Sequence, residues 1–248
     1  MSKSIDEGVL LAVRGGVVKS SVAIGVLRAL EEANIQVKEV SGTSLGSIVA
    51  ALVANGYDSK EILKLFLEYN KILTRAARVL CGRGSIVIEE SVNKEIGNKT
   101  FKDLEKNCYI NASYNKERDP KLFLFSSDTT PDEKVGRACR ASSSLQYIYG
   151  YYKAEVDGNR YRFFDGGYTA NPYIPETDML VVYSTFQTSK EGNYSKLWQR
   201  TPFIAERQTD IVIKPFTNKI GTVGSCDDMR DAYDLGYKEA VKQLRKIR

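Results

Sequence analysis

The sequence predicts an α/β fold with a mainly parallel central sheet, on the strength of three observations. The apolar run at residues 8–13 is short and continuous, as in a strand that is buried on both faces. Strand-like and helix-like stretches then alternate, which is the order found in parallel sheets. Finally, no internal repeat or long linker divides the chain, so we expect one domain over residues 1–248.

In the first half of the chain, short apolar runs predict strands, and apolar residues that recur every three or four positions predict helices. In chain order we expect a strand at 8–13, a helix at 20–33, a strand at 37–40, a buried helix at 48–54, a helix from 58 to about 73 and a helix at 89–96. Asp58 and Glu61 resemble a capping box, which marks the start of the third of these helices.

The second half of the chain is predicted by the same patterns. In chain order we expect strands at 108–113 and 122–125, a helix at 131–141, strands at 179–184 and 210–214, and a closing helix at 227–248. The first two strands are expected to be neighbours across the loop at 115–120. The basic end of the closing helix complements the helix dipole.

A glycine-bounded turn follows the second strand. Residues 42–46 have the G-x-S-x-G pattern, which places a serine nucleophile, here Ser44, on a sharp strand-to-helix turn. Gly42 and Gly46 allow backbone approach where a Cβ atom would clash. The structural alternative is a helix cap made by Thr43 or Ser44.

The chain contains no histidine, so the usual base for a serine nucleophile is absent. Asp165 follows an aromatic pair and precedes Gly166 and Gly167, at a predicted strand end. Burial there raises the pKa of a carboxyl group and makes it a better base. Lys19 is the other candidate, as in serine–lysine pairs, and a plain aspartate turn is the structural alternative.

A second glycine pair, Gly15 and Gly16, lies between the first strand and the helix that starts near Ser20. Such a turn can aim successive backbone N–H groups at one point, beside the positive end of the helix. These donors suit an oxyanion hole for acyl transfer, or a phosphate site. The dinucleotide fingerprint G-x-G-x-x-G is absent, and a plain turn is the alternative.

Taken in order, these elements resemble the patatin-like phospholipase family over most of the chain. The matching segments are 15–20 with the helix after it, 42–46, 141–144 and 165–167. The resemblance implies a three-layer α/β/α fold and a serine–aspartate dyad. Ser44 would attack the acyl carbonyl, Asp165 would accept its proton, and the backbone N–H groups of Gly15, Gly16 and Val17 would hold the oxyanion.

The chain departs from the family pattern at several positions. Val17 and Ser20 replace the third and fourth glycines of the first loop, and a β-branched residue at positive φ is costly, so a reshaped oxyanion turn is one expectation. Gln146 replaces an expected proline. Arg14 stands where a small residue is common. Its side chain could bind a lipid phosphate, but the interpretation we favour is that it is solvated.

The bulk properties bound the partners and the location. The net charge of +5 suits an anionic membrane surface as well as simple solubility, and no nucleic-acid-binding signature appears. We expect a cytoplasmic protein for three reasons. The four cysteines are scattered, no apolar run reaches the ~18 residues that a membrane span needs, and the N-terminus does not resemble a signal peptide. We expect no metal and no cofactor, and the sequence does not predict the oligomeric state.

Two segments are candidates for peripheral contact with an anionic membrane. Lys71, Arg75 and Arg78 form a basic stripe if their helix continues, or they offset the helix dipole. The tyrosines at 147, 149, 151 and 152 suit an interface, and equally a core or a pocket wall.

The sequence therefore predicts a lipid acyl hydrolase of the phospholipase A or lysophospholipase type, with glycerophospholipids or lysophospholipids as substrates. One alternative is a lipid- or partner-binding protein in which the altered glycine loop abolishes or gates hydrolysis. A further alternative is an acyltransferase that uses the same acyl-enzyme.

Overall fold

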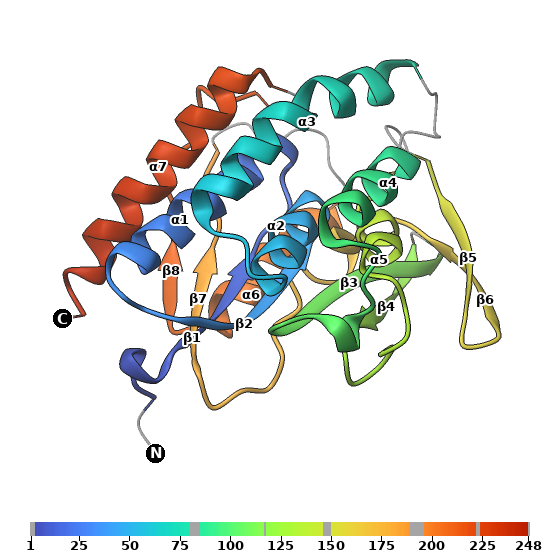
Figure 1. The fold of residues 1–248 in the computed structure, drawn as a ribbon, viewed down its shortest axis with the longest axis horizontal. Coiled ribbons are helices and arrows are strands. Elements are labelled where there is room, and N and C mark those ends of the chain that lie inside the picture. Colours follow the sequence, from blue (N-terminus) through green and yellow to red (C-terminus); the bar gives the residue numbers. More distant parts are fainter. Residues whose placement is uncertain are drawn as a thin grey trace.

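A six-stranded sheet runs through the molecule in the order β4-β3-β2-β1-β7-β8 (Figure 1). The structure is a computed structural model, and it describes residues 3–79, 85–116, 118–145, 150–188, 196–221 and 224–247. The strands are Val9–Val13 (β1), Val37–Thr43 (β2), Asn107–Lys116 (β3), Asp119–Phe125 (β4), Leu180–Ser184 (β7) and Ile211–Ile213 (β8). All pairings among these strands are parallel except that of β3 with β4.

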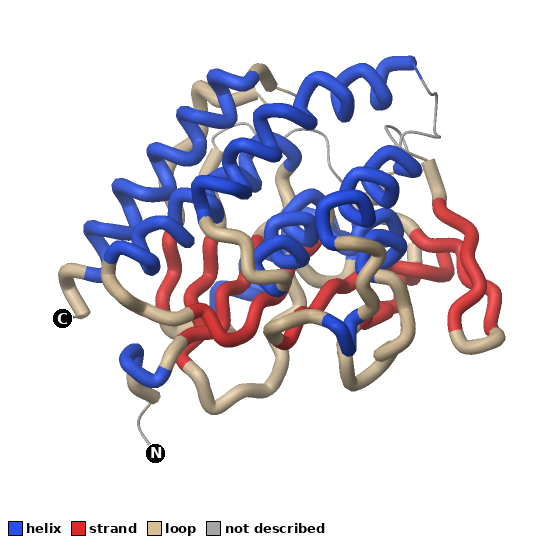
Figure 2. The backbone as a smooth tube through the Cα atoms, viewed as in Figure 1, coloured by secondary structure: helices blue, strands red, loops and turns tan. Residues whose placement is uncertain are grey.

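Most of the helices gather on one face of this sheet (Figure 2). The helices are Ser21–Glu32 (α1), Leu45–Ala54 (α2), Ser59–Val79 (α3), Ser85–Ile96 (α4), Val135–Ser142 (α5), Lys196–Arg207 (α6) and Cys226–Leu244 (α7). Successive side chains of β1 point into two hydrophobic cores on opposite faces of the sheet. Leu11 lies in the larger core, together with residues of α1, α2, α3, α4, α5 and α7. Leu10 lies in the smaller core, together with Ala205 of α6. The predicted three-layer α/β/α fold with a mainly parallel sheet is therefore confirmed.

The predicted strands are all present, and their edges shift by a few residues. The helix expected at 131–141 starts at Val135, because Lys134 forms a β-bridge with Thr100. The helix expected at 89–96 starts earlier, at Ser85, and the closing helix ends at Leu244. The neighbouring pair β3–β4 is confirmed as an antiparallel hairpin.

One hairpin and one helix were not predicted. A hairpin of Tyr152–Val156 (β5) and Asn159–Phe163 (β6) turns at Asp157 and Gly158, both with positive φ, and leads directly to Asp165. Helix α6 was also missed, because it contains Pro202, which ordinarily ends a helical pattern. The Asp-Gly pair is a strong hairpin signal that the sequence did carry.

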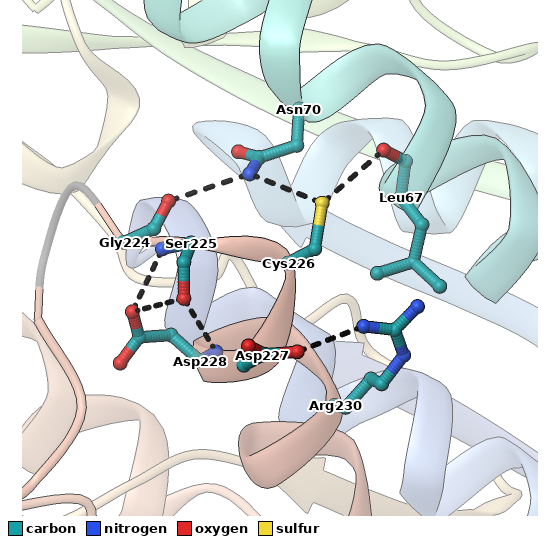
Figure 3. A network of polar contacts seen from close by, with 8 residues as sticks. All are labelled: Leu67, Asn70, Gly224, Ser225, Cys226, Asp227, Asp228 and Arg230. Atoms are coloured by element: carbon teal, nitrogen blue, oxygen red, sulfur yellow. Dashed lines mark hydrogen bonds and ion pairs between the residues drawn. The ribbon is translucent and has the colours of Figure 1, made fainter.

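Polar contacts fasten the start of α7 to α3 (Figure 3). Ser225 Oγ accepts a hydrogen bond from the N–H of Asp228 at 3.1 Å, and the Asp228 carboxylate accepts from the N–H of Ser225 at 2.7 Å. Next to this capping box, Cys226 Sγ donates to the carbonyl of Leu67 at 3.6 Å, and Asn70 Nδ2 donates to the carbonyl of Gly224 at 3.4 Å. The N-terminal turn of α7 is thus held in place against α3 (Figure 3).

None of the helices in the described part of the chain is both long enough and apolar enough to cross a bilayer.

Candidate active site

Ser44 occupies a strained turn between β2 and α2. Its φ is 52° and its ψ is −135°, a conformation that L residues adopt at a cost of about 1–3 kcal/mol. The flanking glycines are needed for close packing: a Cβ atom on Gly42 would overlap the carbonyl of Gly46, and one on Gly46 would lie 2.8 Å from the carbonyl oxygen of Val13. This is the geometry that presents a serine side chain at the carboxyl edge of a sheet.

Asp165 lies directly opposite this serine. Ser44 Oγ donates a hydrogen bond to Asp165 Oδ2 at 2.6 Å, and the Asp165 side chain is buried at 1% exposure. The other carboxylate oxygen, Oδ1, accepts from the N–H of Gly167 at 2.9 Å, which fixes the orientation of the carboxyl group. Gly166 packs against the backbone of Asn111, where a Cβ atom would overlap the carbonyl oxygen. The carboxylate is therefore within proton-transfer distance of the hydroxyl group.

Ser142 of α5 hydrogen-bonds the backbone of Ser44. Its Oγ accepts a hydrogen bond from the N–H of Ser44 at 2.8 Å and donates to the carbonyl of Asn111 at 2.7 Å. The side-chain amide of Asn111 in turn donates to the carbonyl of Gly166 at 3.0 Å. Sequence motifs pointed to the segment around Ser142 but assigned it no role, and nothing in the sequence pointed to Asn111.

The Gly15–Val17 turn lies against Ser44, since a Cβ atom on Gly15 would lie 2.7 Å from the Cβ of Ser44. Val17 has a φ of 52°, so it holds the left-handed conformation that glycine favours. The N–H of Gly15 donates to Asn171 Oδ1 at 2.8 Å. Within the described residues, the N–H groups of Gly16 and Val17 donate no hydrogen bond to the protein.

Arg14 is buried behind this turn, at 5% exposure, so the preference for a solvated side chain was wrong. It donates to the carbonyl oxygen of Phe186 at 2.9 Å, and its guanidinium lies 4.1 Å from the centroid of the Phe186 ring. The ring in turn packs against Gly16, where an added Cβ atom would lie 2.5 Å from two ring atoms. Phe186 was not predicted, because a single phenylalanine after a strand carries no distinguishing pattern.

Lys19 packs on the same ring, with Nζ at 5.5 Å from the Phe186 centroid. Burial lowers the pKa of Lys19, and the positive charge of Arg14 lowers it further. No hydrogen bond joins Lys19 to Ser44 in the described residues, whereas Asp165 makes one. Ser20, at the fourth glycine position, is buried and donates from Oγ to the carbonyl of Arg14 at 3.4 Å.

Part of the predicted membrane-contact surface lies outside the described residues. These parts are Tyr147 and Tyr149, and the side chains of Lys71, Arg75 and Arg78. Gln146, at the position of the expected proline, also lies outside the described residues. Of the remaining tyrosines, Tyr152 is buried in the core, whereas Tyr151 is 37% exposed under the guanidinium of Arg162, 3.6 Å from the ring centroid. Across the described ranges, no three cysteine or acidic side chains gather as a metal site.

Sequence comparison relates the chain to known proteins. The sequence profile described as patatin-like phospholipase matches residues 11–178. The chain is 29% identical to the uncharacterized protein YqhO of Bacillus subtilis, over 63% of this chain and 62% of YqhO. It is 26% identical to the cUMP-AMP-activated phospholipase of Escherichia coli, over 65% of this chain and 55% of that protein. The chain thus spans less than two thirds of the length of these two relatives.

Solved structures share the fold at lower identity. VipD from Legionella pneumophila superposes with a TM-score of 0.60 at 16% identity, covering 98% of this chain and 68% of VipD. The type III effector ExoU, which is from Pseudomonas aeruginosa, gives 0.58 at 18% identity, covering 96% of this chain and 53% of ExoU. With the profile match spanning more than half of its residues, the chain belongs to the patatin-like phospholipase family.

Proposed function

We propose that this protein is a lipid acyl hydrolase in which Ser44 is the nucleophile and Asp165 the base. The observation that supports this most is the 2.6 Å hydrogen bond from Ser44 Oγ to Asp165 Oδ2, in a chain that has no histidine to act instead. The strained φ of Ser44 adds support, because such strain concentrates at functional sites.

The geometry suggests a two-step mechanism. Asp165 takes the hydroxyl proton as Ser44 Oγ attacks the acyl carbonyl, and the N–H groups of Gly16 and Val17 stabilise the oxyanion. The leaving alcohol takes the proton back from Asp165, leaving an acyl-enzyme. Asp165 then deprotonates a water molecule, which releases the fatty acid and restores the Ser44 hydroxyl. The third expected donor, the N–H of Gly15, would hold the turn through Asn171 instead.

We infer that the substrates are phospholipids or lysophospholipids at a membrane surface. Family membership supports the lipid class, and the E. coli relative is named a phospholipase. The net charge of +5 supports peripheral contact with an anionic membrane. We propose that the protein makes this contact from the cytoplasm. Activation by a nucleotide is named for the E. coli protein alone, and we do not propose it for this chain.

The alternative of a lipid-binding protein without activity rests on the replacement of a loop glycine by Val17. The φ of 52° at Val17 favours the enzyme, because the backbone keeps a glycine-like conformation despite the side chain.

Fatty-acid release from phosphatidylcholine and phosphatidylglycerol vesicles tests the proposal. Wild type is expected to release fatty acid, and Ser44→Ala and Asp165→Asn are each expected to lower the rate at least about 1000-fold with unchanged circular dichroism. Asp157→Asn, at the exposed tip of the β5–β6 hairpin, is the matched control and keeps the wild-type rate. Equal rates in wild type and Ser44→Ala would overturn the proposed nucleophile.

A further inference from the structure

Two aromatic side chains are exposed on segments that border the proposed active site. Phe216 follows β8 and is 64% exposed, and Tyr151 precedes β5 and is 37% exposed. A single apolar side chain on a surface is ordinary, whereas two aromatic rings beside one site point to a surface that a partner covers.

Phe216 is held beside the proposed oxyanion turn by its backbone. It forms a parallel β-bridge with Gln187, whose carbonyl oxygen accepts a hydrogen bond from the N–H of Thr217 at 2.8 Å. The residue before Gln187 is Phe186, whose ring packs against Gly16. The backbone of Phe216 is therefore fixed, and its ring is nevertheless left in solvent.

Tyr151 lies on the side of the site that carries the proposed base. Its ring contacts that of Phe164, the residue before Asp165, with 6.4 Å between the ring centroids. The guanidinium of Arg162 lies over the Tyr151 ring, and Lys153 stands directly opposite Arg162 in the β5–β6 hairpin. Two like charges in directly opposite positions destabilise a hairpin, so an anionic partner would relieve their repulsion.

The sheet order places the two rings on opposite sides of Ser44. The backbone of Phe164, which contacts Tyr151, hydrogen-bonds to Ser113 of β3, whereas Phe216 follows β8. Between β3 and β8 lie β2, which leads to Ser44, then β1 and β7. At about 4.8 Å between neighbouring strands, the rings stand roughly 20 Å apart, so a partner that contacts both is an extended surface.

We propose that this edge of the molecule is a membrane-docking surface, with the rings of Phe216 and Tyr151 inserted among the lipid head groups. Aromatic side chains are enriched at that depth of a bilayer. Each ring has an exposed basic neighbour to pair with anionic lipid: Arg162 for Tyr151, and Lys219 for Phe216.

The inference rests on the proposed function, because it names the surface through which the hydrolase meets its lipid substrate. A folded protein seated across both rings would cover Ser44 and exclude the substrate. A bilayer in the same place brings the substrate to Ser44, which is why we assign the surface to a membrane.

Binding of Ser44→Ala to vesicles, measured by co-sedimentation, tests the surface without hydrolysis. Vesicles of equal parts phosphatidylcholine and phosphatidylglycerol should bind more tightly than pure phosphatidylcholine vesicles. In this background, Phe216→Ser should lower the affinity for the mixed vesicles about tenfold, because burial of the ring is lost. Arg162→Gln should lower it about fivefold, because one positive charge is lost, and Tyr151→Ser should lower it as well.

Matched controls lie at the other end of the molecule. Ile247 is 46% exposed and Arg245 is also exposed, both beyond the end of α7. Tyr237 of α7 already donates to Glu32, the last residue of α1, at 2.6 Å, and the C-terminus lies near the N-terminus, at the end of the sheet where β1 begins (Figure 1). Ile247→Ser and Arg245→Gln should therefore leave vesicle affinity within about twofold of Ser44→Ala alone.

Unchanged affinity in Phe216→Ser or Arg162→Gln, or an equal loss in the matched control, overturns the docking surface. A dimer that Phe216→Ser dissociates, without vesicle binding, would overturn it in favour of a second copy of the chain. In the active protein, Phe216→Ser should slow fatty-acid release from the mixed vesicles and keep kcat/KM for p-nitrophenyl butyrate within about twofold.

The two proposals fail separately. If wild type hydrolyses neither vesicles nor the soluble ester, but Ser44→Ala binds vesicles with the expected losses, the proposed function fails and the docking surface stands. If wild type is active and Phe216→Ser binds and hydrolyses the mixed vesicles as wild type does, the docking surface fails alone.

Discussion

Replacing Gly16 by alanine should disable the proposed oxyanion turn while leaving the fold intact. An added Cβ atom would lie 2.5 Å from two atoms of the Phe186 ring, whereas carbon atoms pack best at about 3.5–4.0 Å. Either the ring or the turn must therefore move by about 1 Å. The ring cannot move freely, because Arg14 stacks on it at 4.1 Å and also binds the carbonyl of Phe186 at 2.9 Å.

The turn is thus expected to shift, together with the N–H groups of Gly16 and Val17. A displacement of about 1 Å near reacting groups costs about 100-fold in rate, and loss of one oxyanion donor costs about 100- to 1000-fold. We expect Gly16→Ala to lower kcat for a short-chain ester by about 100-fold, with KM within about twofold of wild type, since the lost interaction acts on the transition state.

A second substitution tests the cause. Phe186→Leu gives space to the new Cβ atom, so the double variant Gly16→Ala/Phe186→Leu should recover at least about tenfold of the lost kcat. Phe186→Leu alone serves as the control. The reasoning is refuted if Gly16→Ala retains near wild-type kcat, or if the double variant is no more active than Gly16→Ala.

Three further predictions follow from contacts near Ser44. Val17→Gly should raise the free energy of unfolding in urea by about 1 kcal/mol, because it removes a strained φ. Val18→Gly, at a buried position without positive φ, is the control and should lower the free energy of unfolding. A less stable Val17→Gly together with a more stable Val18→Gly would contradict the strain at Val17. Ser142→Ala removes the acceptor of the Ser44 N–H and should lower kcat about tenfold and stability by about 1 kcal/mol, and an unchanged kcat would exclude a positioning role. The lowered pKa of Lys19 means that the folded state binds fewer protons between that pKa and 10.5, so stability should rise with pH in this window; Lys19→Met should remove the rise, and parallel pH profiles would contradict it.

Much of the fold could be predicted because its signals are local. The buried strands are continuous apolar runs, and the G-x-S-x-G turn at Ser44 needs glycines for reasons that steric overlap explains. The β5–β6 hairpin was missed even though Asp157-Gly158 carries a turn signal, and α6 was missed because Pro202 masks its pattern.

The candidate site could be predicted only in part, because much of it depends on contacts between distant segments. The sequence pointed to Ser44 and Asp165, which the fold brings together across 121 positions of the chain. The partners that support them are different: Asn171 binds the N–H of Gly15 across 156 positions, and Phe186 has its role only because the fold places it under Arg14. Such contacts depend on the sheet order and leave no short motif.

Covalent labelling by a fluorophosphonate probe, followed by mass spectrometry of the digested protein, tests the central claim most directly. We expect the probe on Ser44 in wild type, no labelling of Ser44→Ala, and labelling of Asp165→Asn slowed by at least about 100-fold because no base then takes the hydroxyl proton. Labelling at another residue, or at an equal rate in Asp165→Asn, would contradict the Ser44–Asp165 dyad.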